Sequence, residues 1–440
     1  MKTKDKRYGI SLIVLVITII VIIILATAVI VTVVKNNPIQ KASEANFKQT
    51  TDAFKDQLNL RIIENALDNN QSSEFLQAST EEEILKYIPI MKDKTVNGIK
   101  YTDLFEIQNG KLVIKDTSRE DLNKWGEDIN VISKKDLPLI PTGFKYIEGT
   151  KNTGVVISDN AGNEFVFVPI DNPGPDNDLN DMGNFRKLIS DTKFVDNIAD
   201  DINISNAIKR SVKKAKGFYI SRYEIGIGGN ATFNDKINQS ETKLSLTNWE
   251  NAFPVSKKGA KPWNFISREK SKEVAASMYT GNIKSYLVSS YAWDSTLRWL
   301  YKSGDKTLEQ MEKDSSAWGN YLNSEIILNN ADIYSKDGKT YSSAVNLSNL
   351  KKANEAIILS TGAGSNKKNM TNNIYDLAGN LKEWTTEDGS FENKIYAVRR
   401  TGCFGDLGND FNKGYPASGR IGDNAWSLGI GVGFRTILYW

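Results

Sequence analysis

The sequence contains no histidine and a single cysteine, Cys403. A single cysteine excludes a disulfide within the chain, and without histidine no zinc site of the usual cysteine and histidine kind can form. Catalytic mechanisms that use histidine as their base are excluded as well. Because a chain of 440 residues can form a stable core without disulfides, these absences do not argue against an extracellular protein.

The chain also lacks any excess of charge beyond its first nine residues. It has 56 basic and 53 acidic side chains, which give a net charge of +3. The N-terminal residues Lys2, Lys4, Lys6 and Arg7, opposed by Asp5, supply this whole excess. The rest of the chain is neutral and has no basic surface for a phosphate backbone, so we expect no nucleic acid partner.

A long apolar run follows the basic segment, from Ile10 to Val34. As a helix this run would span about 37 Å, more than the roughly 30 Å of a bilayer's hydrocarbon core. The basic residues before it place Met1 in the cytoplasm and the C-terminal part outside the cell. The run therefore predicts a long N-terminal transmembrane helix that anchors the chain in the cell membrane.

Gly9 separates the basic leader, residues 1–9, from this run. A short basic leader ending in glycine, followed by a hydrophobic and then amphipathic helix, resembles a type IV prepilin. In that family a prepilin peptidase cleaves after the glycine and the new first residue is methylated, which implies cleavage between Gly9 and Ile10. The alternative is an uncleaved signal anchor. Mass spectrometry of the native N-terminus decides between them, because an intact Met1 in cells with an active peptidase excludes cleavage.

The sequence departs from the prepilin pattern at Val14. Prepilins usually carry glutamate at this fifth mature position, where it pairs with the amine of a neighbouring subunit. Valine removes that partner but is easily retained in a membrane, so the change affects assembly with other pilin subunits more than cleavage. A pilus subunit, a subunit at a filament tip and an anchored monomer all remain open.

An amphipathic continuation of the helix is predicted up to residue 68. Apolar residues recur at helical spacing on one face, namely Phe47, Phe54, Leu58, Ile62 and Ala66. This stripe packs against the domain that follows or, as in pilins, forms a filament spine. The stretch NNQSS then breaks the pattern, and residues 69–140 are predicted to form a small α/β segment. Within it, Asn109-Gly110 between alternating apolar residues predicts a tight hairpin.

Short strands alternating with turns are expected from residue 141 to 440, beginning with a hairpin in GVVISDNAGNEFVFVPI. Three stretches in this region, NIYDLAGNLKEW, RRTGCF and the terminal GFR, resemble in their order the formylglycine-generating-enzyme (sulfatase-modifying factor) family. The resemblance covers residues 141–440 and implies that family's variant C-type-lectin-like fold. The fold class implied for the whole chain is α+β: a long N-terminal helix, a small α/β segment and a large lectin-like domain rich in short strands and irregular loops.

The motifs that carry catalysis in this family are missing. Members that oxidise cysteine to formylglycine bind copper with two cysteines shortly after the glycine-rich strand, and the corresponding stretch GDLGNDFNKGYPASGRIGDNAWSLG has none. Cys403 lies earlier, at the position of the family's serine. Related iron-dependent sulfoxide synthases bind their metal through histidines. We therefore predict a domain that is not an enzyme; the alternative is a surface enzyme with an unusual activity on the same fold.

The resemblance also implies a calcium site. In the family's motif the ion is held by two side chains and the backbone carbonyls between them, which correspond to Asp376, Gly379, Leu381 and Glu383. Hard oxygen donors suit Ca²⁺, which takes roughly 6–8 of them. The alternative is a plain turn in which Asp376 caps the backbone and Glu383 is exposed to solvent.

A ligand site is predicted in the segment from Gly405 to Gly431. Long loops on a rigid scaffold often carry binding residues, and this segment offers Tyr415, Arg420 and Trp426, residue types that supply much of the energy at interfaces. The ligand would be an extracellular protein or a carbohydrate. The alternative is that Tyr415 and Trp426 fold inward and cover the core.

These features predict a pilin-like surface protein, anchored in the membrane or associated with a filament, that displays a non-catalytic lectin-like domain for adhesion or ligand binding. A pseudopilin of a secretion or DNA-uptake machine is a further alternative. Such pseudopilins rarely need so large a domain outside the membrane.

Overall fold

The computed structural model describes residues 16–23, 38–69, 76–108, 110–115, 117, 119–170, 193–196, 202–229, 252–328, 331–335, 345–347, 350–363, 370–413 and 415–440. The chain divides into two compact units, Met1–Ile129 and Asn130–Trp440. The predicted boundary of the large domain, Pro141, lies shortly after the start of the second unit. Gly9, Ile10 and Val14 lie outside the described residues, so cleavage after Gly9 stays a prediction.

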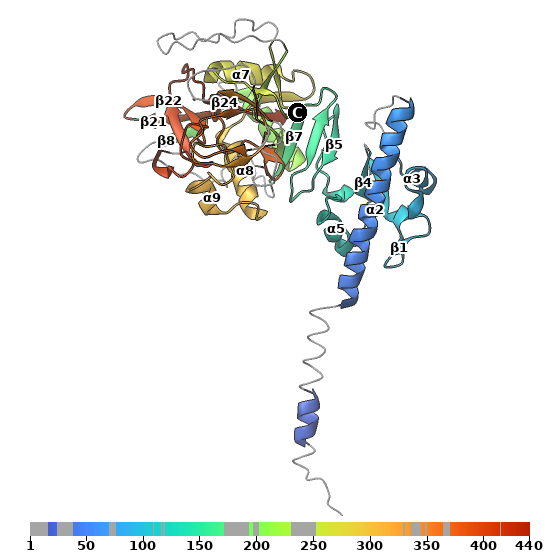
Figure 1. Ribbon diagram of the computed structural model, residues 1–440. Coiled ribbons are helices and arrows are strands. Elements are labelled where there is room, and N and C mark those ends of the chain that lie inside the picture. The colour runs from blue at the N-terminus through green and yellow to red at the C-terminus, as the bar shows by residue number, and fades with distance from the viewer. Residues whose placement is uncertain are drawn as a thin grey trace, which may run out of the picture. The chain divides into compact units, whose positions relative to one another are not determined.

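One long helix, α2 (Pro38–Asn69), dominates the first unit, with short helices and strands beside it (Figure 1). These shorter elements are α3 (Glu81–Tyr87), η2 (Pro89–Met91), β1 (Thr95–Val96), β2 (Ile99–Lys100), α4 (Tyr101–Leu104), β3 (Phe105–Gln108), β4 (Lys111–Ile114) and α5 (Glu120–Glu127). Strands β3 and β4 pair antiparallel, with Gln108 opposite Lys111. The hairpin predicted at Asn109-Gly110 is thereby confirmed.

The apolar stripe on α2 forms the core of this first unit. Phe47, Phe54 and Leu58 are buried, and the rings of Phe47 and Phe54 lie 6.1 Å and 5.0 Å from the ring of Tyr101. Ile62, the last residue of the stripe whose side chain the structure describes, is half-buried. Because each fully buried aromatic or aliphatic side chain contributes about 1.5–3 kcal/mol, these contacts hold α2 to the small α/β segment that follows it.

The prediction of a long N-terminal transmembrane helix is wrong. Among the residues that the structure describes, none of the helices combines the length and the apolar sequence that crossing a bilayer requires. Of the apolar run, residues 16–23 are described, and they are helical. The longest described helix, α2, carries charges such as Lys41, Glu44, Lys48 and Asp52 on successive turns. The chain is mixed α and β, with many strands.

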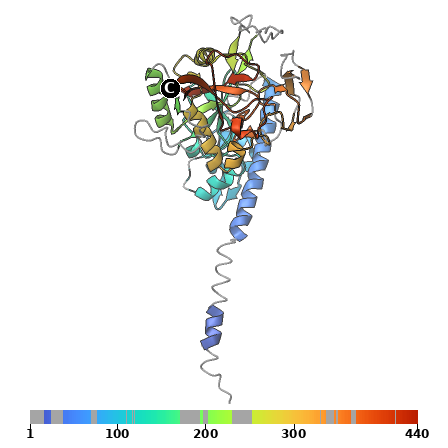
Figure 2. The same ribbon diagram turned by 90° about the vertical axis from the view of Figure 1, so that its left-hand side faces the viewer.

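A six-stranded antiparallel sheet lies at the centre of the second unit, in the order β13-β25-β9-β7-β6-β5. Its strands are β5 (Phe144–Glu148), β6 (Val156–Asp159), β7 (Glu164–Pro169), β9 (Gly217–Ser221), β13 (Lys284–Leu287) and β25 (Thr436–Tyr439). The pairing of β6 with β7 confirms the predicted hairpin. The C-terminal end lies beside helix α6 (Ile202–Ala215), green in Figure 2, where the backbone N–H of Trp440 donates to Ser211 Oγ at 3.2 Å.

A second sheet of five strands positions the candidate site. Strand β21 (Lys382–Phe391) pairs antiparallel with β22 (Lys394–Arg400) and parallel with β24 (Val432–Phe434). The outer strands β23 (Arg420–Asp423) and β8 (Lys193–Asp196) pair with β22 and β21. Lys382 and Glu383, at the start of β21, therefore lie beside Val432 and Gly433 of β24.

The remaining elements of the second unit are short and surround the two sheets. They are η3 (Lys134–Asp136), β10 (Gly226–Gly228), β11 (Phe253–Val255), β12 (Lys261–Pro262), α7 (Arg268–Ser277), α8 (Ser290–Lys302), α9 (Leu308–Glu312), β14 (Ile326–Ile327), β15 (Ala331–Ser335), β16 (Val345–Leu347), β17 (Leu350–Lys351), β18 (Ile358–Leu359), β19 (Met370–Thr371), β20 (Ile374–Tyr375) and η6 (Phe411–Lys413).

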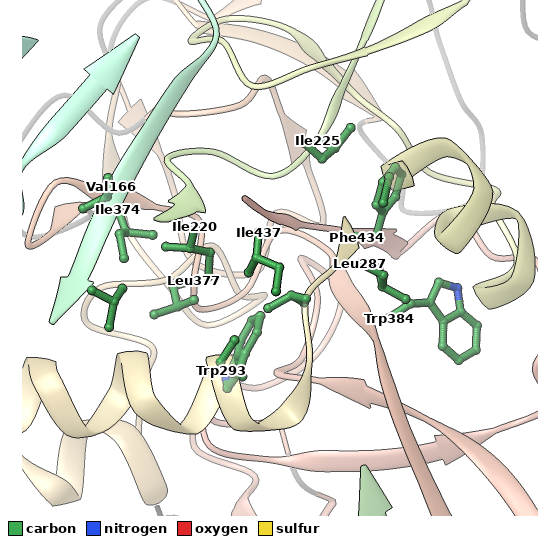
Figure 3. Packing of buried hydrophobic residues seen from close by; sticks show 14 of the residues in the cluster. Val166, Ile220, Ile225, Leu287, Trp293, Ile374, Leu377, Trp384, Phe434 and Ile437 are labelled. Carbon is green, nitrogen blue, oxygen red and sulfur yellow. The ribbon is translucent and has the colours of Figure 1, made fainter. Parts of the chain in front are cut away.

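One large apolar cluster joins helix α8 to both sheets. Ser289 begins α8 as its N-cap, since its side chain accepts a hydrogen bond from the backbone of Ala292. The turn before β21, residues 376–381 of the stretch NIYDLAGNLKEW, is called the motif turn. Figure 3 shows Trp293 pointing from α8 toward Ile437 of β25 and Leu377 of this turn, and all three are buried. Burial of these long-range partners together fixes the motif turn against the sheet that ends the chain.

Candidate functional site

A cluster of charged and aromatic side chains surrounds Cys403, just after the end of β22. Lys382 Nζ lies 2.6 Å from Asp406 Oδ2 and 3.7 Å from Cys403 Sγ, and 5.0 Å from the centre of the Tyr415 ring. Asp406 also accepts a hydrogen bond of 2.8 Å from the backbone N–H of Cys403. We call Lys382, Arg399, Cys403, Asp406 and Tyr415 the Cys403 cluster.

The backbone that leads into this cluster is strained. Thr401 has a φ of +57°, a left-handed conformation that is rare for a β-branched residue. Its hydroxyl holds it there, because Thr401 Oγ1 lies 2.8 Å from the hydroxyl of Tyr321 and accepts from the backbone N–H of Gly379 at 3.2 Å. The backbone of Gly431 packs closely against Cys403, since a Cβ on Gly431 would lie 2.7 Å from Cys403 Sγ. Strain of this kind is often found at functional sites.

Cys403 itself has the chemistry of a buried thiol. Burial raises its pKa to about 11, although the Lys382 ammonium opposes the shift. The reactive form of cysteine is the thiolate, which is therefore scarce at neutral pH. The side chain packs in an apolar cluster with Phe265, Ile358 and Phe404. Cys403 is thus a small core residue with a weakly nucleophilic sulfur.

Arg399 connects the Cys403 cluster to the segment that carries Trp426. Its Nη2 lies 2.7 Å from Asp423 Oδ2, and the hydroxyl of Ser427 donates to the other oxygen of the same carboxylate at 2.9 Å. The backbone N–H of Trp426 donates to Asn424 Oδ1 at 3.0 Å. The Trp426 side chain is 71% exposed, whereas every other tryptophan in the described ranges is buried or half-buried. The turn therefore presents one indole to solvent from a fixed backbone.

The three predicted ligand-binding residues have different environments. Trp426 is exposed, and Tyr415 is half-buried, with the ammonium groups of Lys382 and Lys413 at 5.0 Å and 6.0 Å from its ring centre. Arg420 is only 1% exposed and pairs with buried carboxylates, as described below. An internal guanidinium has no surface for a ligand, which corrects the prediction for Arg420. The alternative in which Tyr415 and Trp426 fold inward is wrong for Trp426.

Two further exposed side chains on the same segment were not predicted. Leu407 and Phe411 are 42% and 47% exposed, although both are large and apolar. Neither is an arginine, a tyrosine or a tryptophan, the residue types from which the ligand site was predicted. Apolar residues isolated among Gly, Asp and Asn were the signal that could have identified them, since such a stretch cannot form a core of its own.

The predicted calcium residues lie together, but around an arginine. Arg435 Nε and Nη2 donate to the two oxygens of Glu383 at 2.9 Å and 2.8 Å, and both side chains are fully buried. Asp376 Oδ2 accepts from the backbone N–H of Gly362 at 2.7 Å. The alternative in which Glu383 is exposed to solvent is therefore wrong.

A third carboxylate, the fully buried Glu224, completes this group, which we call the carboxylate cluster: Glu224, Asp376 and Glu383. Glu383 is also fully buried, whereas Asp376 is half-buried. Glu224 accepts from the side chain of Asn380 at 2.7 Å and from the backbone N–H of Leu381 at 2.9 Å. Gly379, with a φ of +72°, makes the intervening turn. Among the described residues no three acidic or cysteine side chains have an arrangement that could hold a metal ion. With both Glu383 oxygens on a guanidinium, the residues present do not fit calcium.

The carboxylate cluster retains protons at pH values where exposed acids lose them. Burial raises the pKa of Asp376 to about 6, against the opposing hydrogen bond from Gly362 and the charge of Arg435. Burial, together with the neighbouring charges of Asp376 and Glu383, raises the pKa of Glu224 well above its usual range. The pKa of Glu383 is also raised by burial, although Arg435 opposes it. One guanidinium cannot neutralise three ionised carboxylates.

No protein-family model matches the chain, and no curated protein matches it. The resemblance to the formylglycine-generating-enzyme family thus stays a prediction that rests on the three motifs.

We expect Asp376→Asn to stabilise the protein at neutral pH. In the wild type the folded state binds the Asp376 proton more tightly than the unfolded state, so this stabilisation is complete below about pH 4 and is lost as the pH rises through about 6. Asparagine keeps the acceptor for Gly362 and tolerates the φ of +55°. Urea unfolding should show a gain of about 1–3 kcal/mol at pH 7.5 that disappears near pH 4.

Thermal unfolding of the wild type and of Asp376→Asn, with and without calcium, tests the calcium hypothesis. Since the residues present do not fit the ion, we expect calcium to leave the thermal midpoint of the wild type unchanged. A rise in the midpoint with calcium, lost in Asp376→Asn, would instead establish a site at this turn. Lower stability of Asp376→Asn at pH 7.5 would contradict the raised pKa of Asp376.

Proposed function

We propose that this chain is a non-catalytic ligand-binding protein of the cell surface, whose segment from Gly405 to Gly431 attaches to an extracellular protein or a carbohydrate. The observation that carries the proposal is the 71% exposed side chain of Trp426. Tryptophan and arginine are the side chains most enriched where binding energy concentrates, and an indole face can also stack on a sugar ring.

The surroundings of Trp426 support this function. Leu407 and Phe411 are also exposed on this segment, so it carries several apolar side chains that water solvates poorly. Hydrogen bonds hold the backbone: the N–H of Leu322 donates to the carbonyl of Asp406 at 2.8 Å, and the N–H of Gly408 donates to Asn323 Oδ1 at 2.9 Å. A segment ordered before binding loses little entropy when it binds.

The extracellular setting of the proposal comes from the N-terminal sequence. The basic leader ending at Gly9 supports processing by a prepilin peptidase at Ile10, and the resemblance to prepilins supports presentation outside the cell. The missing cysteine pair and the lack of histidine support binding rather than catalysis. Adhesion is the role that combines these features.

Substitution of Trp426 tests the proposal directly. The purified chain is presented to immobilised extracellular matrix proteins and to a panel of glycans, and its attachment is compared with that of Trp426→Ala and Phe411→Ala. Loss of a central aromatic contact costs about 2 kcal/mol or more, so we expect affinity to fall roughly 30-fold with an unchanged thermal midpoint.

The matched control is Ile395→Ala. Ile395 is 75% exposed but lies on β22, outside the segment, so its loss removes a comparable apolar surface elsewhere. Attachment by this variant should equal that of the wild type. If Trp426→Ala and Phe411→Ala both fold and attach as the wild type does, the segment is not the binding site.

A further inference from the structure

Lys351, at the end of β17, is buried with its ammonium group among backbone carbonyls. The residue has no exposed surface, and its Nζ donates to the carbonyl oxygens of Tyr321, Leu322 and Ser324. The Leu322 and Ser324 oxygens lie at 3.5 Å and 2.9 Å, and that of Tyr321 is closer. An ammonium has three N–H donors and no acceptor, so three carbonyls match it.

This environment is the kind that proteins use for bound cations. Backbone carbonyls replace the hydration shell of a metal ion in many cation sites. Among the described residues no carboxylate lies within ion-pair distance of Lys351 Nζ, although the charges of Glu325 and Glu355 favour the ammonium form. Burial dominates and lowers the pKa of Lys351 to about 8, which leaves the group mostly charged at pH 7.

The residues that surround the ammonium also hold the binding segment. The hydroxyl of Tyr321 donates to the carbonyl of Tyr415 at 2.9 Å. The backbone N–H of Leu322 donates to the carbonyl of Asp406, and Asn323 Oδ1 accepts from the backbone N–H of Gly408. Residues 321–324 thus contact the cation on one side and the segment on the other.

We propose that the carbonyls of Tyr321, Leu322 and Ser324 form a cation site that the chain fills with its own Lys351 ammonium, and that this filled site positions residues 406–415, the first part of the segment from Gly405 to Gly431. Lys351 is a positioning residue, since it acts through residues 321–324. The second half of the inference rests on the proposed function, whereas the cation site itself does not.

The experiment removes the side chain and supplies a replacement cation. In Lys351→Ala the missing atoms correspond to n-propylammonium, which can offer the same N–H donors. Amide hydrogen exchange, followed by mass spectrometry in the full chain at pH 7, should become roughly tenfold faster or more in residues 402–415 of the variant. A millimolar series of n-propylammonium chloride should restore slow exchange and raise the thermal midpoint.

Three controls separate a cation site from general effects. Tetramethylammonium chloride at equal ionic strength carries charge without N–H donors and should restore nothing. Lys352→Ala removes the same charge from an exposed neighbour and should leave exchange in residues 402–415 unchanged. Lys351→Met fills the space without charge and should show the same fast exchange as Lys351→Ala, without rescue.

The hydrogen-exchange results decide whether the cation site exists without the use of any ligand of the binding segment. Slow exchange in residues 402–415 of Lys351→Ala, or fast exchange that n-propylammonium does not reverse, overturns the proposal. If Lys351→Ala fails to fold, refolding by n-propylammonium but not by tetramethylammonium supports the site, and failure of both rejects it. Rescue of exchange combined with unchanged attachment of both Trp426→Ala and Phe411→Ala would uphold the cation site and reject the proposed binding function.

Discussion

Replacement of Arg435 by methionine should lower the free energy of unfolding by about 3–5 kcal/mol at pH 7.5. Arg435 is the cation of the carboxylate cluster, fully buried and hydrogen-bonded to both oxygens of Glu383. It also donates to the carbonyl oxygens of Ser221 and Tyr375, each at 3.0 Å. Methionine fills much of the space but leaves buried carboxylates without a counter-charge and two carbonyls without a donor, and each such loss is costly.

The deficit should depend on pH. Without Arg435 the three carboxylates can become neutral by binding protons, and burial already raises the pKa of each. The folded variant would bind more protons than the folded wild type, so lowering the pH stabilises it relative to the wild type. Urea unfolding at pH 7.5 and pH 5 measures the difference, and we expect a smaller deficit at pH 5.

An exposed ion pair provides the control for this prediction. Lys270→Met breaks the contact of 2.6 Å with Glu273 on the surface of α7, and exposed pairs contribute only about 0.2–1 kcal/mol. A cost for Arg435→Met as small as that of Lys270→Met would contradict the role given to Arg435. A deficit that grows toward pH 5 would contradict the protonation argument.

Local sequence patterns were enough to predict the local structures. The Asn109-Gly110 hairpin and the hairpin of β6 and β7 depend on turn residues and alternation within a few positions, and both are confirmed. The stripe on α2 follows from the same short-range periodicity, and its members Phe47 and Phe54 are buried. Each of these features is determined by residues that are neighbours in the chain.

Hydropathy gave the wrong prediction for the N-terminal run. A hydropathy pattern measures the preference of side chains for a non-aqueous environment, whereas a membrane span also requires a continuous helix of about 20 residues. Of the apolar run, the structure describes residues 16–23 as a helix. Among the described residues none of the helices meets both conditions.

Partners that are distant in sequence explain the remaining errors. The motif suggested that Asp376 and Glu383 belong together, and they do. It could not show that Glu383 pairs with Arg435, which lies 52 residues later, or that Glu224 enters from a strand region far earlier in the chain. Because of those two contacts, the oxygens of Glu383 are bound to a guanidinium and a third carboxylate lies beside them.

Arg420 and Trp426 illustrate the same limit within one segment. Both were predicted to contact a ligand from their residue types. Strand pairing places Arg420 directly opposite Arg400, inside the second sheet, while Trp426 lies beyond the end of β23 on a turn. Tertiary pairing, which the local sequence does not reveal, decides which of the two is exposed.

Arg420→Ala should therefore destabilise the protein by at least about 3 kcal/mol, an effect on folding rather than on attachment. Arg420 Nε lies 3.1 Å from each oxygen of Glu387, and Nη2 lies 2.5 Å from Asp294 Oδ2. Nη2 also donates to the hydroxyl of Ser290 at 3.1 Å. The alanine variant leaves a cavity and keeps the buried Glu387 charge without this cation, and Arg400 can pair with only part of the remaining acidic charge.

The variant that removes both charges separates this explanation from simple loss of volume. Arg420→Met combined with Glu387→Met replaces a buried ion pair with apolar side chains, which in proteins is often neutral, so it should recover most of the stability that Arg420→Ala loses. Urea unfolding compares the three variants, with Trp426→Ala expected within about 0.5 kcal/mol of the wild type because its exposed side chain makes few packing contacts.

If Arg420→Ala instead unfolds like the wild type and attaches to ligand less well, residue 420 belongs to the binding surface and the burial of its guanidinium is incorrect. The free energy of unfolding, measured beside attachment, therefore distinguishes an arginine that builds the fold from one that contacts a ligand.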